Sequence, residues 1–507
     1  MNSVGEVPAA IDLDQLTLDS FAGRPVAVLG LARSGVALAR FLAGQGARVT
    51  VYDGRPPSEL GDSLAQLRDR AVEAVLGPDA DPATLLARQA LVCTSPSVNS
   101  RYPTTEPRLR AALAAVEQDG RVPVVSEVDL FLRLCPSSVV GVTGTKGKTT
   151  TSSLSAAVLG ASGAPAVLGG NIGTPLVERL PELTPEHRVV LELSELQLPT
   201  LSRGTDVAVY THVTSDHLDR HGTLDAYRRV KRRLAELTPR DGVVVLNAED
   251  PVSADFAGAT DARVMFYRRT TPLPGGVGVV DGWIVAGGVK RLGHAGGGDA
   301  MTGPAGRILS LDDVRLPGAH NTSNVLAAVA VGLLYGVAPD AIRQAVAGFG
   351  GVEHRLETVA VVDGVRFVND SMGTQPDAVV AALRAFPPPI VLIAGGRTKG
   401  LSIDYLADVV AERAGGVVLM GESGPQLGRA FAAAGAGRLE YADSLDDAVR
   451  QAASMARDLA GRSERREATV LLSPAAASFD MFVDYAARGQ AFRDAVGRLS
   501  AERGGPL

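Results

Sequence analysis

The stretch GVTGTKGKTTTS, residues 141–152, contains the glycines that decide how this chain is interpreted. An apolar run typical of a buried strand, SSVVGVTG, leads into it, and the helix-like segment KTTTSSLSAAVLGASG leaves it. The usual phosphate-loop spacing, G-x-x-x-x-G-K-[ST], needs a glycine at Val142, whereas Gly141 lies one residue early and Gly144 two residues late. The stretch therefore predicts a phosphate-binding turn of a variant kind.

A glycine turn between a strand and a helix binds phosphate because its backbone N–H groups point at one place, where the helix dipole adds partial positive charge. We expect Lys148 to neutralise the β- and γ-phosphate oxygens of ATP, and the Thr149 hydroxyl to ligate Mg²⁺. The alternative is an ordinary glycine turn, which the flanking strand and helix disfavour. The predicted ATP-binding segment comprises Gly144, Thr145, Lys146, Gly147, Lys148, Thr149 and Thr150.

Strand-like and helix-like segments alternate along the rest of the chain in three blocks. RPVAVLG, SGVALARFLAGQG and ARVTVYD form a strand–helix–strand unit, and similar alternation returns after residues 136 and 350. This pattern predicts an α/β protein of parallel, doubly wound sheets, with domains at 1–136, 137–350 and 351–507. The glycine-rich segment 268–308 differs; we expect a hairpin or a mobile excursion there, and a cofactor-binding segment is the less favoured alternative.

Composition excludes several classes of protein. The 507 residues carry a net charge of -6 without a basic tail, so we expect no nucleic-acid partner. The two cysteines, Cys93 and Cys135, predict buried thiols and no disulfide framework or zinc site. The N-terminal residues do not resemble a signal peptide, and no apolar run is long enough to span a membrane, so we expect a cytoplasmic protein.

Polar residues at predicted strand ends suggest a metal site. Glu192 alternates with leucines at the end of LELS, and a buried carboxylate there needs a partner, either a cation or a structural salt bridge. Asp216, His217, Asp219 and His221 cluster just past another strand, where α/β proteins place their ligands. His217 is the expected metal ligand, through a neutral ring nitrogen.

Lys231 lies in TLDAYRRVKRRL, which at first suggests a solvated basic helix. At 100° per residue, however, Lys231 falls on the face that carries Leu224, Tyr227, Val230, Leu234 and Ala235. We therefore predict that this lysine is buried. Because burial disfavours a charged amine, Lys231 is a candidate to add carbon dioxide and become an anionic carbamate that ligates Mg²⁺ with His217.

Motifs along nearly the whole chain resemble those of the Mur ligases, the ATP-dependent amide ligases of peptidoglycan precursor synthesis. In chain order they are GTKGKTT, LELSELQL, TSDHLDRHG, GAHNTSN, EHRLE, NDS, AGGRTKG and LLSPAAASFD. The resemblance implies a Rossmann-like UDP-binding domain, a central P-loop ATPase domain and a C-terminal Rossmann-like domain. It also implies ATP, two Mg²⁺ ions and a carbamylated Lys231.

The resemblance assigns expected roles to individual residues. Those around the metals are Thr149, Glu192, His217 and Lys231; those around the nucleotide are Asn324, Arg355 and Asp370. The expected UDP contacts are Ser34, Asp53 and Arg55, and the expected muramoyl contacts are Asn171 and Ser194. The expected amino-acid pocket comprises Thr374, Lys399, Ser478 and Phe479.

Within the family, the two ends of the chain most resemble the branch that adds D-glutamate to UDP-N-acetylmuramoyl-L-alanine. We expect the protein to be a monomer. Three departures put the amino-acid preference in question: Met372 where many relatives have lysine, Ser97 where glycine is usual, and Glu195 where serine is common. A paralogue that uses another amino acid, such as L-glutamate, is therefore the alternative. An oxidoreductase, suggested by GLARSG and Asp53, and a non-enzymatic ATP-binding regulator are weaker alternatives.

Overall fold

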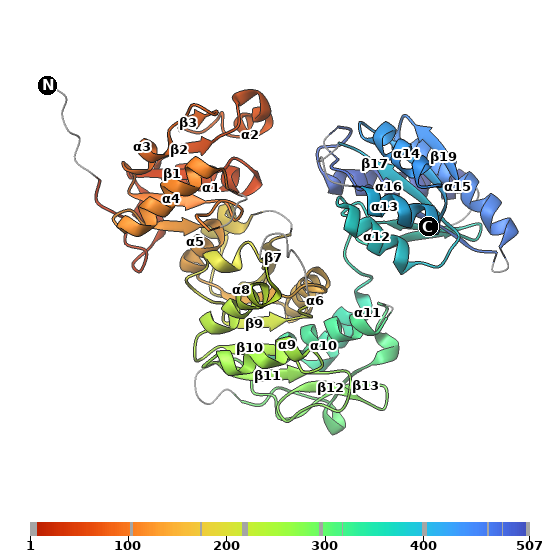
Figure 1. Ribbon diagram of the computed structural model, residues 1–507. Helices are drawn as coiled ribbons and strands as arrows, with labels where there is room; N and C mark the ends of the chain where they lie inside the picture. Colours follow the sequence, from red (N-terminus) through yellow and green to blue (C-terminus); the bar gives the residue numbers. More distant parts are fainter. Residues whose placement is uncertain are drawn as a thin grey trace. The chain divides into compact units, whose positions relative to one another are not determined.

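The computed structural model describes residues 8–101, 105–172, 175–214, 222–293, 298–316, 318–397, 403–463, 466–478 and 480–502. The chain divides into two compact units, residues 1–349 and 350–507. The first unit holds two sheets and the second unit holds one (Figure 1). The predicted α/β class is confirmed, since helices alternate with mostly parallel strands in all three sheets.

The first sheet has five parallel strands in the order β3-β2-β1-β4-β5. Its strands are short and apolar, as expected for strands that helices cover on both faces. They are β1 (Pro25–Leu29), β2 (Arg48–Asp53), β3 (Val72–Leu76), β4 (Leu91–Thr94) and β5 (Val124–Ser126). The helices are α1 (Arg33–Gly44), α2 (Gly61–Ala65), α3 (Pro82–Leu86), α4 (Pro107–Asp119) and α5 (Glu127–Leu134).

The second sheet has nine strands in the order β14-β13-β12-β11-β10-β9-β6-β8-β7. The parallel strands are β6 (Ser138–Thr143), β7 (Ala166–Gly170), β8 (Arg188–Glu192), β9 (Val207–Tyr210), β10 (Val243–Asn247) and β11 (Arg263–Tyr267). In register, Val142 of β6 pairs with Glu192 of β8, and Thr143 pairs with Tyr210 of β9. This pairing brings the carboxyl ends of three strands to one edge beside the glycine turn.

The far end of this sheet is antiparallel. Strands β12 (Val277–Val280) and β13 (Trp283–Ala286) form the hairpin predicted within 268–308, and β14 (Arg307–Ser310) adds an edge. The helices of this part of the unit are α6 (Lys148–Gly160), α8 (Leu224–Leu237), α9 (Pro251–Asp255), α10 (Ala319–Leu334) and α11 (Pro339–Gly348). The apolar sides of α6, α10 and α11 build one core against the sheet, and α8 covers the opposite face.

Helix α5 joins the first sheet to the second through a partly buried polar network. The Asp129 carboxylate accepts hydrogen bonds from Ser202 N (2.6 Å), Ser202 Oγ (2.7 Å) and Arg203 N (3.2 Å). Arg133, whose side chain is 8% exposed, pairs with Asp129 at 3.0 Å and donates to Ser202 Oγ. One continuous apolar core runs past this network from the first sheet into the second.

The second unit contains a six-stranded sheet in the order β15-β16-β20-β17-β18-β19. Its strands are β15 (Glu357–Val362), β16 (Val365–Asn369), β17 (Ile390–Gly395), β18 (Ala414–Met420), β19 (Arg438–Ala442) and β20 (Ala468–Leu472). All neighbours are parallel except β15 and β16, which form an antiparallel pair that the strand–helix alternation did not predict. A two-residue turn at Asp363 and Gly364, both with positive φ, joins those two strands.

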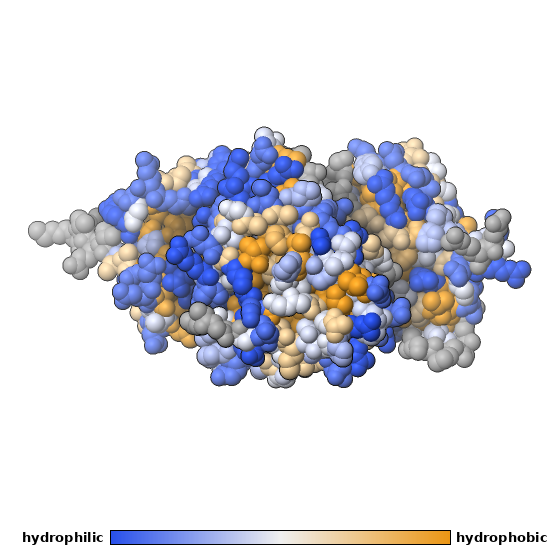
Figure 2. Space-filling view, turned by 90° about the horizontal axis from the view of Figure 1, so that it is seen from below, coloured by the Kyte–Doolittle hydropathy of each residue, from blue (hydrophilic) through white to orange (hydrophobic). Residues whose placement is uncertain are grey.

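Helices cover both faces of the third sheet. Helices α12 (Pro376–Ala385), α13 (Asp404–Arg413) and α14 (Gly424–Ala433) build one core, while α15 (Leu445–Arg462) and α16 (Tyr485–Glu502) build the other. The surface in Figure 2 is mostly hydrophilic with separate apolar areas, which is normal for globular proteins. Within the described part of the chain, no helix is both long and apolar enough to cross a membrane.

Candidate active site

The predicted phosphate-binding turn lies between β6 and α6. Gly144 and Gly147 both have positive φ, +145° and +89°. A Cβ at Gly144 would collide with the Thr211 hydroxyl, and a Cβ at Gly147 would collide with the Asn324 side chain. The turn is held by Thr145 N, which donates to the carbonyl oxygen of His212 at 2.7 Å. Glycine at these two positions is thus required both by the backbone conformation and by the close approach of neighbouring elements.

The charged residues of the turn begin α6. Lys148 is the first residue of the helix, and its Nζ donates to the carbonyl oxygens of Gly144 (3.1 Å) and Thr145 (3.0 Å). Thr149 is 6% exposed, whereas Lys146 and Thr150 are more accessible. An ammonium group that rests on two carbonyl oxygens at the mouth of the turn is able to move onto a phosphate bound there.

Glu192, the last residue of β8, is 2% exposed. Its Oε1 accepts a hydrogen bond from Asn171 Nδ2 at 2.9 Å, and Asn171 N in turn donates to the Glu192 carbonyl oxygen at 2.8 Å. Its buried Oε2 has no hydrogen-bond partner among the described residues. An oxygen of this kind is costly unless a cation approaches it, so the site fits Mg²⁺ at this edge of the sheet.

Lys231 is 1% exposed, so the burial predicted from helical periodicity is confirmed. Its Nζ donates to Thr143 Oγ1 at 3.3 Å and lies 5.5 Å from the ring centroid of Tyr227. Thr143 ends β6 directly before the glycine turn. The described residues hold no group of three His, Cys, Asp or Glu side chains that could bind a metal ion. Of the predicted metal ligands, Glu192 alone is one of these residue types and lies among the described residues. Asp216, His217, Asp219 and His221 lie outside the described residues.

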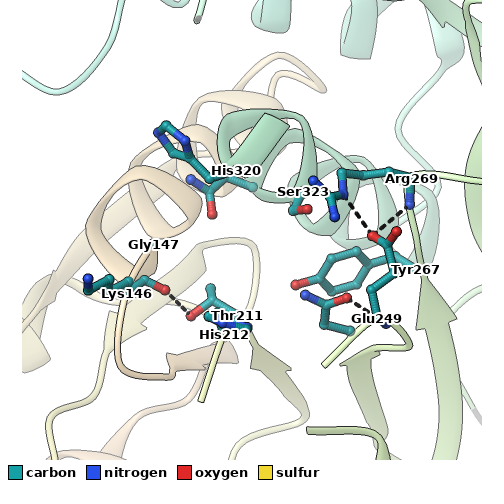
Figure 3. Close-up of a pocket in the computed structure, with 11 residues that line it drawn as sticks. Lys146, Gly147, Thr211, His212, Glu249, Tyr267, Arg269, His320 and Ser323 are labelled. Carbon is teal, nitrogen blue, oxygen red and sulfur yellow. Dashed lines mark hydrogen bonds and ion pairs between the residues drawn. The ribbon is translucent and has the colours of Figure 1, made fainter. Parts of the chain in front are cut away.

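A cavity of about 280 Å³ opens beside the turn (Figure 3). Lys146, Gly147, Thr211 and His212 lie toward one end of it, and Tyr267, Glu249 and Arg269 toward the other. The remaining residues that line the cavity are Asn247, His320, Ser323 and Asn324. Asn324, which was expected near the nucleotide, therefore lies beside the glycine turn. The cavity therefore connects the glycine turn with the polar side chains of Glu249 and Arg269.

The sequence did not identify most of the residues that line this cavity as site residues. Asn247 is the last residue of β10, and Glu249 accepts hydrogen bonds from Arg269 N (3.0 Å) and Nε (2.9 Å). Burial opposes ionisation of Glu249, but the hydrogen bonds from Arg269 outweigh it, so the pKa of Glu249 lies below its ordinary value. The position of these lining residues in the sequence could have indicated them, because both LNAED and MFYRR place polar residues after buried strands, where α/β proteins bind ligands.

The expected UDP residues lie at the carboxyl edge of the first sheet. Asp53 ends β2, and both its oxygens accept hydrogen bonds from Arg55, at 3.0 Å from Nε and 2.8 Å from Nη2. Burial of Asp53 is outweighed by these bonds and by one from Leu31 N, so its pKa lies below the usual range. Asp53 and Arg55 line a cavity with Gly30, whereas Ser34, the second residue of α1, does not line it.

Ser194 follows β8, close in sequence to Glu192. It is 8% exposed, and both its N and its Oγ donate to Gln197 Oε1 at 2.9 Å. Ser194 is thus held in a tight turn behind Glu192, where its hydroxyl already has an acceptor.

The remaining expected site residues belong to the second unit. Asp370 is 5% exposed and accepts hydrogen bonds from Ser473 Oγ (2.6 Å) and Leu356 N (3.2 Å). Burial raises the pKa of Asp370 to about 6, against the opposing effects of Ser473 and Arg355. Thr374 is half-buried and Ser478 is buried. Lys399 and Phe479 lie outside the described residues.

Arg488 is a structural residue of this edge that the sequence did not indicate. It is 1% exposed and donates from Nε to Ser371 Oγ (3.0 Å) and from Nη2 to the carbonyl oxygens of Ser371 (3.0 Å) and Ala476 (3.3 Å). Burial lowers the pKa of Arg488 to about 10, and Asp480 opposes that shift. Arg488 thereby ties the loop after β16 to the loop after β20.

Comparison with known proteins agrees with this geometry. Residues 142–332 match the Mur ligase middle domain, residues 354–476 the Mur ligase glutamate ligase domain, and residues 24–117 the MurD-like N-terminal domain. Curated relatives from Symbiobacterium thermophilum and Roseiflexus are 39% and 40% identical, each over 94% of this chain and 98% of the relative. A relative from Pelotomaculum thermopropionicum is 38% identical over 96% of this chain and 100% of its own length. All three carry the name UDP-N-acetylmuramoylalanine--D-glutamate ligase.

The chain therefore belongs to the Mur ligase family, as its motifs predicted. It is an ATP-dependent amino-acid ligase of peptidoglycan synthesis, and ligases of this family use ATP and Mg²⁺. Family membership decides against the oxidoreductase and the non-enzymatic regulator.

Proposed function

We propose that this ligase joins D-glutamate to UDP-N-acetylmuramoyl-L-alanine at the expense of ATP. The observation that carries the proposal is the convergence of the glycine turn, the uncompensated oxygen of Glu192 and the buried Lys231 on one edge of the second sheet. The names of the relatives supply the identity of the two substrates. We further propose the domain ranges 1–136, 137–350 and 351–507 for binding the UDP-substrate, ATP and the amino acid.

A carboxylate resists attack by an amine because its leaving group would be oxide. In the proposed reaction, an oxygen of the L-alanyl carboxylate attacks the γ-phosphorus of ATP, and ADP leaves with the electrons of the broken P–O bond. The amine of D-glutamate then attacks the carbonyl carbon of the acyl phosphate. Inorganic phosphate leaves, the nitrogen loses a proton, and an amide bond remains.

This chain's own residues hold the reactants in line. Lys148 moves from the loop carbonyls to the phosphates, where it offsets the repulsion between two anions. Glu192, Thr149, His217 and Lys231 are the proposed metal ligands, and a Mg²⁺ ion held by them would stabilise charge on the transferred phosphoryl group. Asn171 orients Glu192 through its 2.9 Å hydrogen bond.

We also propose that two Mg²⁺ ions bind and that Lys231 is carbamylated. The neutral amine adds to the carbon of carbon dioxide and loses a proton, which leaves an anionic carbamate. The burial of Lys231 and its position 3.3 Å from Thr143 Oγ1, at the foot of the turn, support this modification. We further propose that the enzyme acts in the cytoplasm as a monomer.

The remaining expected residues have proposed roles in substrate binding. Ser34, Asp53 and Arg55 bind the uridine diphosphate, and Asn171 and Ser194 bind the muramoyl part. Asn324, Arg355 and Asp370 bind the nucleotide. The amino-acid pocket is proposed at Thr374, Lys399, Ser478 and Phe479.

The test is product formation from ATP, UDP-N-acetylmuramoyl-L-alanine and a panel of D- and L-amino acids, followed by mass spectrometry and phosphate release. We expect one equivalent each of amide product and phosphate with D-glutamate. Product with L-glutamate and none with D-glutamate would support the paralogue instead. Departures at Met372, Ser97 and Glu195 make this panel necessary.

A further inference from the structure

At the carboxyl edge of the third sheet, β17 and β20 are neighbouring parallel strands. Helix α13, which follows β17, packs on one face, whereas α16, which follows β20, packs on the other. The two chain segments therefore leave the edge in opposite directions. In doubly wound sheets such a point opens a crevice in which ligands bind.

Arg397 lies at this edge. It follows β17, and its N donates to the carbonyl oxygen of Ala477 at 2.8 Å, while Ala477 N donates back to the Arg397 carbonyl oxygen at 3.1 Å. These two bonds fix the backbone of Arg397 directly beside Ser478, a proposed contact of the amino-acid substrate. The Arg397 side chain is 52% exposed, so its guanidinium group is accessible to a ligand.

Arg397 is also the single basic residue among the described residues of the loops that follow β16, β17, β18 and β20. The same loops carry Asp370, Glu422 and Asp480, while the guanidinium of Arg488 at this edge is buried against loop carbonyl oxygens. On the β16 side, Met372 contributes no charge. Lys399, which is also proposed for the amino-acid pocket, follows in the same loop but lies outside the described residues. Arg397 is the described cation placed to meet an anionic amino acid that enters here.

The counter-ion of Arg397 is easily exchanged. Its Nε lies 3.5 Å from Oε2 of Glu422, and the Glu422 side chain is 53% exposed. Ion pairs between exposed side chains contribute little to stability because water screens them and both side chains lose freedom. A carboxylate presented by a substrate can replace that of Glu422 on the planar guanidinium fork.

We infer that Arg397 binds the side-chain carboxylate of the incoming D-glutamate and thereby selects a dicarboxylic amino acid, with Glu422 as its counter-ion when no substrate is bound. This inference rests on the proposed function. The α-carboxylate shares a carbon with the reacting amine and must stay near it. The side-chain carboxylate lies farther along the molecule, and it is the group free to reach Arg397.

The test is steady-state kinetics of Arg397→Gln and Arg397→Lys with D-glutamate and D-glutamine. For Arg397→Gln we expect the KM for D-glutamate to rise about 10- to 100-fold, which corresponds to the loss of a charge-assisted hydrogen bond. The preference for D-glutamate over D-glutamine in kcat/KM should fall by the same factor, while the KM for ATP changes less than about twofold. Arg397→Lys should lie between, because it keeps the charge and loses the fork.

Glu422→Gln provides an independent variant. Because it removes the competing carboxylate, we expect the KM for D-glutamate to fall by about two- to threefold. The matched control is Arg438→Gln, since Arg438 is 50% exposed and pairs with Glu440, yet it begins β19 at the opposite edge of the sheet. All variants should melt within about 3 °C of the wild type.

Hydroxylamine trapping of the activated UDP-substrate, with ATP and without amino acid, tests the proposed function by itself. No hydroxamate from the wild-type enzyme would overturn that function. With hydroxamate formed, an unchanged D-glutamate to D-glutamine preference in folded Arg397→Gln would overturn the role of Arg397 alone. An unchanged or raised KM for D-glutamate in Glu422→Gln would also contradict it.

Discussion

Replacing Glu192 by glutamine tests the proposed metal site with little disturbance of the fold. The glutamine side chain has the same shape, and its Oε1 can still accept the 2.9 Å hydrogen bond from Asn171. The change removes the negative charge and replaces Oε2, the buried oxygen without a described partner, by an amide nitrogen. Glu192→Gln therefore separates the charge of this residue from its packing.

The expected magnitudes follow from that exchange. Without nucleotide or Mg²⁺, the free energy of unfolding should change by no more than about 1 kcal/mol, because one unmet hydrogen-bonding group replaces another. The rate of ligation should fall by about 10²–10³ or more, because a ligand of the cation that would stabilise the transferred phosphoryl group is lost. Ligand binding stabilises the native state by about 2.7 kcal/mol at 100 times Kd and by only about 0.4 kcal/mol at Kd.

Thermal unfolding with and without Mg²⁺ and ATP gives a second measurement besides activity. At a concentration 100 times the wild-type Kd, a variant with 100-fold weaker binding should lose most of the ligand-induced rise in Tm. Glu178→Gln is the control, since Glu178 is 41% exposed and pairs only with the surface residue Arg40 among the described residues. A folded Glu192→Gln enzyme with a near-normal rate and an unchanged Tm response would refute the assignment of Glu192 as a ligand.

Four further outcomes are expected. Lys148→Ala should lower turnover by about 10²–10³ or more while the fold is kept, and a near-normal rate would contradict the proposed phosphate contact. Lys231→Ala should lose activity, and added acetate should restore part of it by filling the carbamate position. Intact-protein mass spectrometry should find an adduct of 44 Da, the mass of CO₂, on the wild type only. An active alanine variant would contradict the carbamate. Lys399→Ala should raise the KM for D-glutamate far more than that for ATP, and equal changes in both would show that the pocket is misplaced. Because the pKa of Asp370 is raised to about 6, the native state holds this proton more tightly than the unfolded chain, so the free energy of unfolding should fall by up to about 3 kcal/mol as the pH rises from about 4 to about 6. Asp370→Asn should remove that part of the pH dependence, and parallel curves for the two proteins would contradict it.

Local sequence patterns were sufficient to predict the parts of the site that lie within one continuous segment of the chain. The glycine turn was predictable because a strand, a turn and a helix follow one another in the chain, and the structure has β6 and α6 on either side of it. The burial of Lys231 was predictable because the periodicity of a single helix decides which face is covered. Neither prediction needed knowledge of distant residues.

Features that depend on several elements were not predictable in this way. Arg269 and Glu249 line the cavity beside the glycine turn only because β10 and β11 end side by side, and one sequence does not reveal that pairing. Arg488 lies in a helix rich in charged residues, where an exposed position is the usual expectation, yet carbonyl oxygens from two loops surround it. The antiparallel edge strand β15 was missed because it interrupts the regular strand–helix alternation.

The polar network around Asp129 has a consequence for dividing the protein into fragments. A fragment that ends after residue 136 would lack Ser202 and Arg203, and the carboxylate of Asp129 would lose its partners from that loop. It would also expose the apolar side of α5 that the second sheet covers. The amino-terminal sheet is therefore a poor choice for expression in isolation, and a soluble fragment is expected only from cuts near residue 350, where the two compact units meet in sequence.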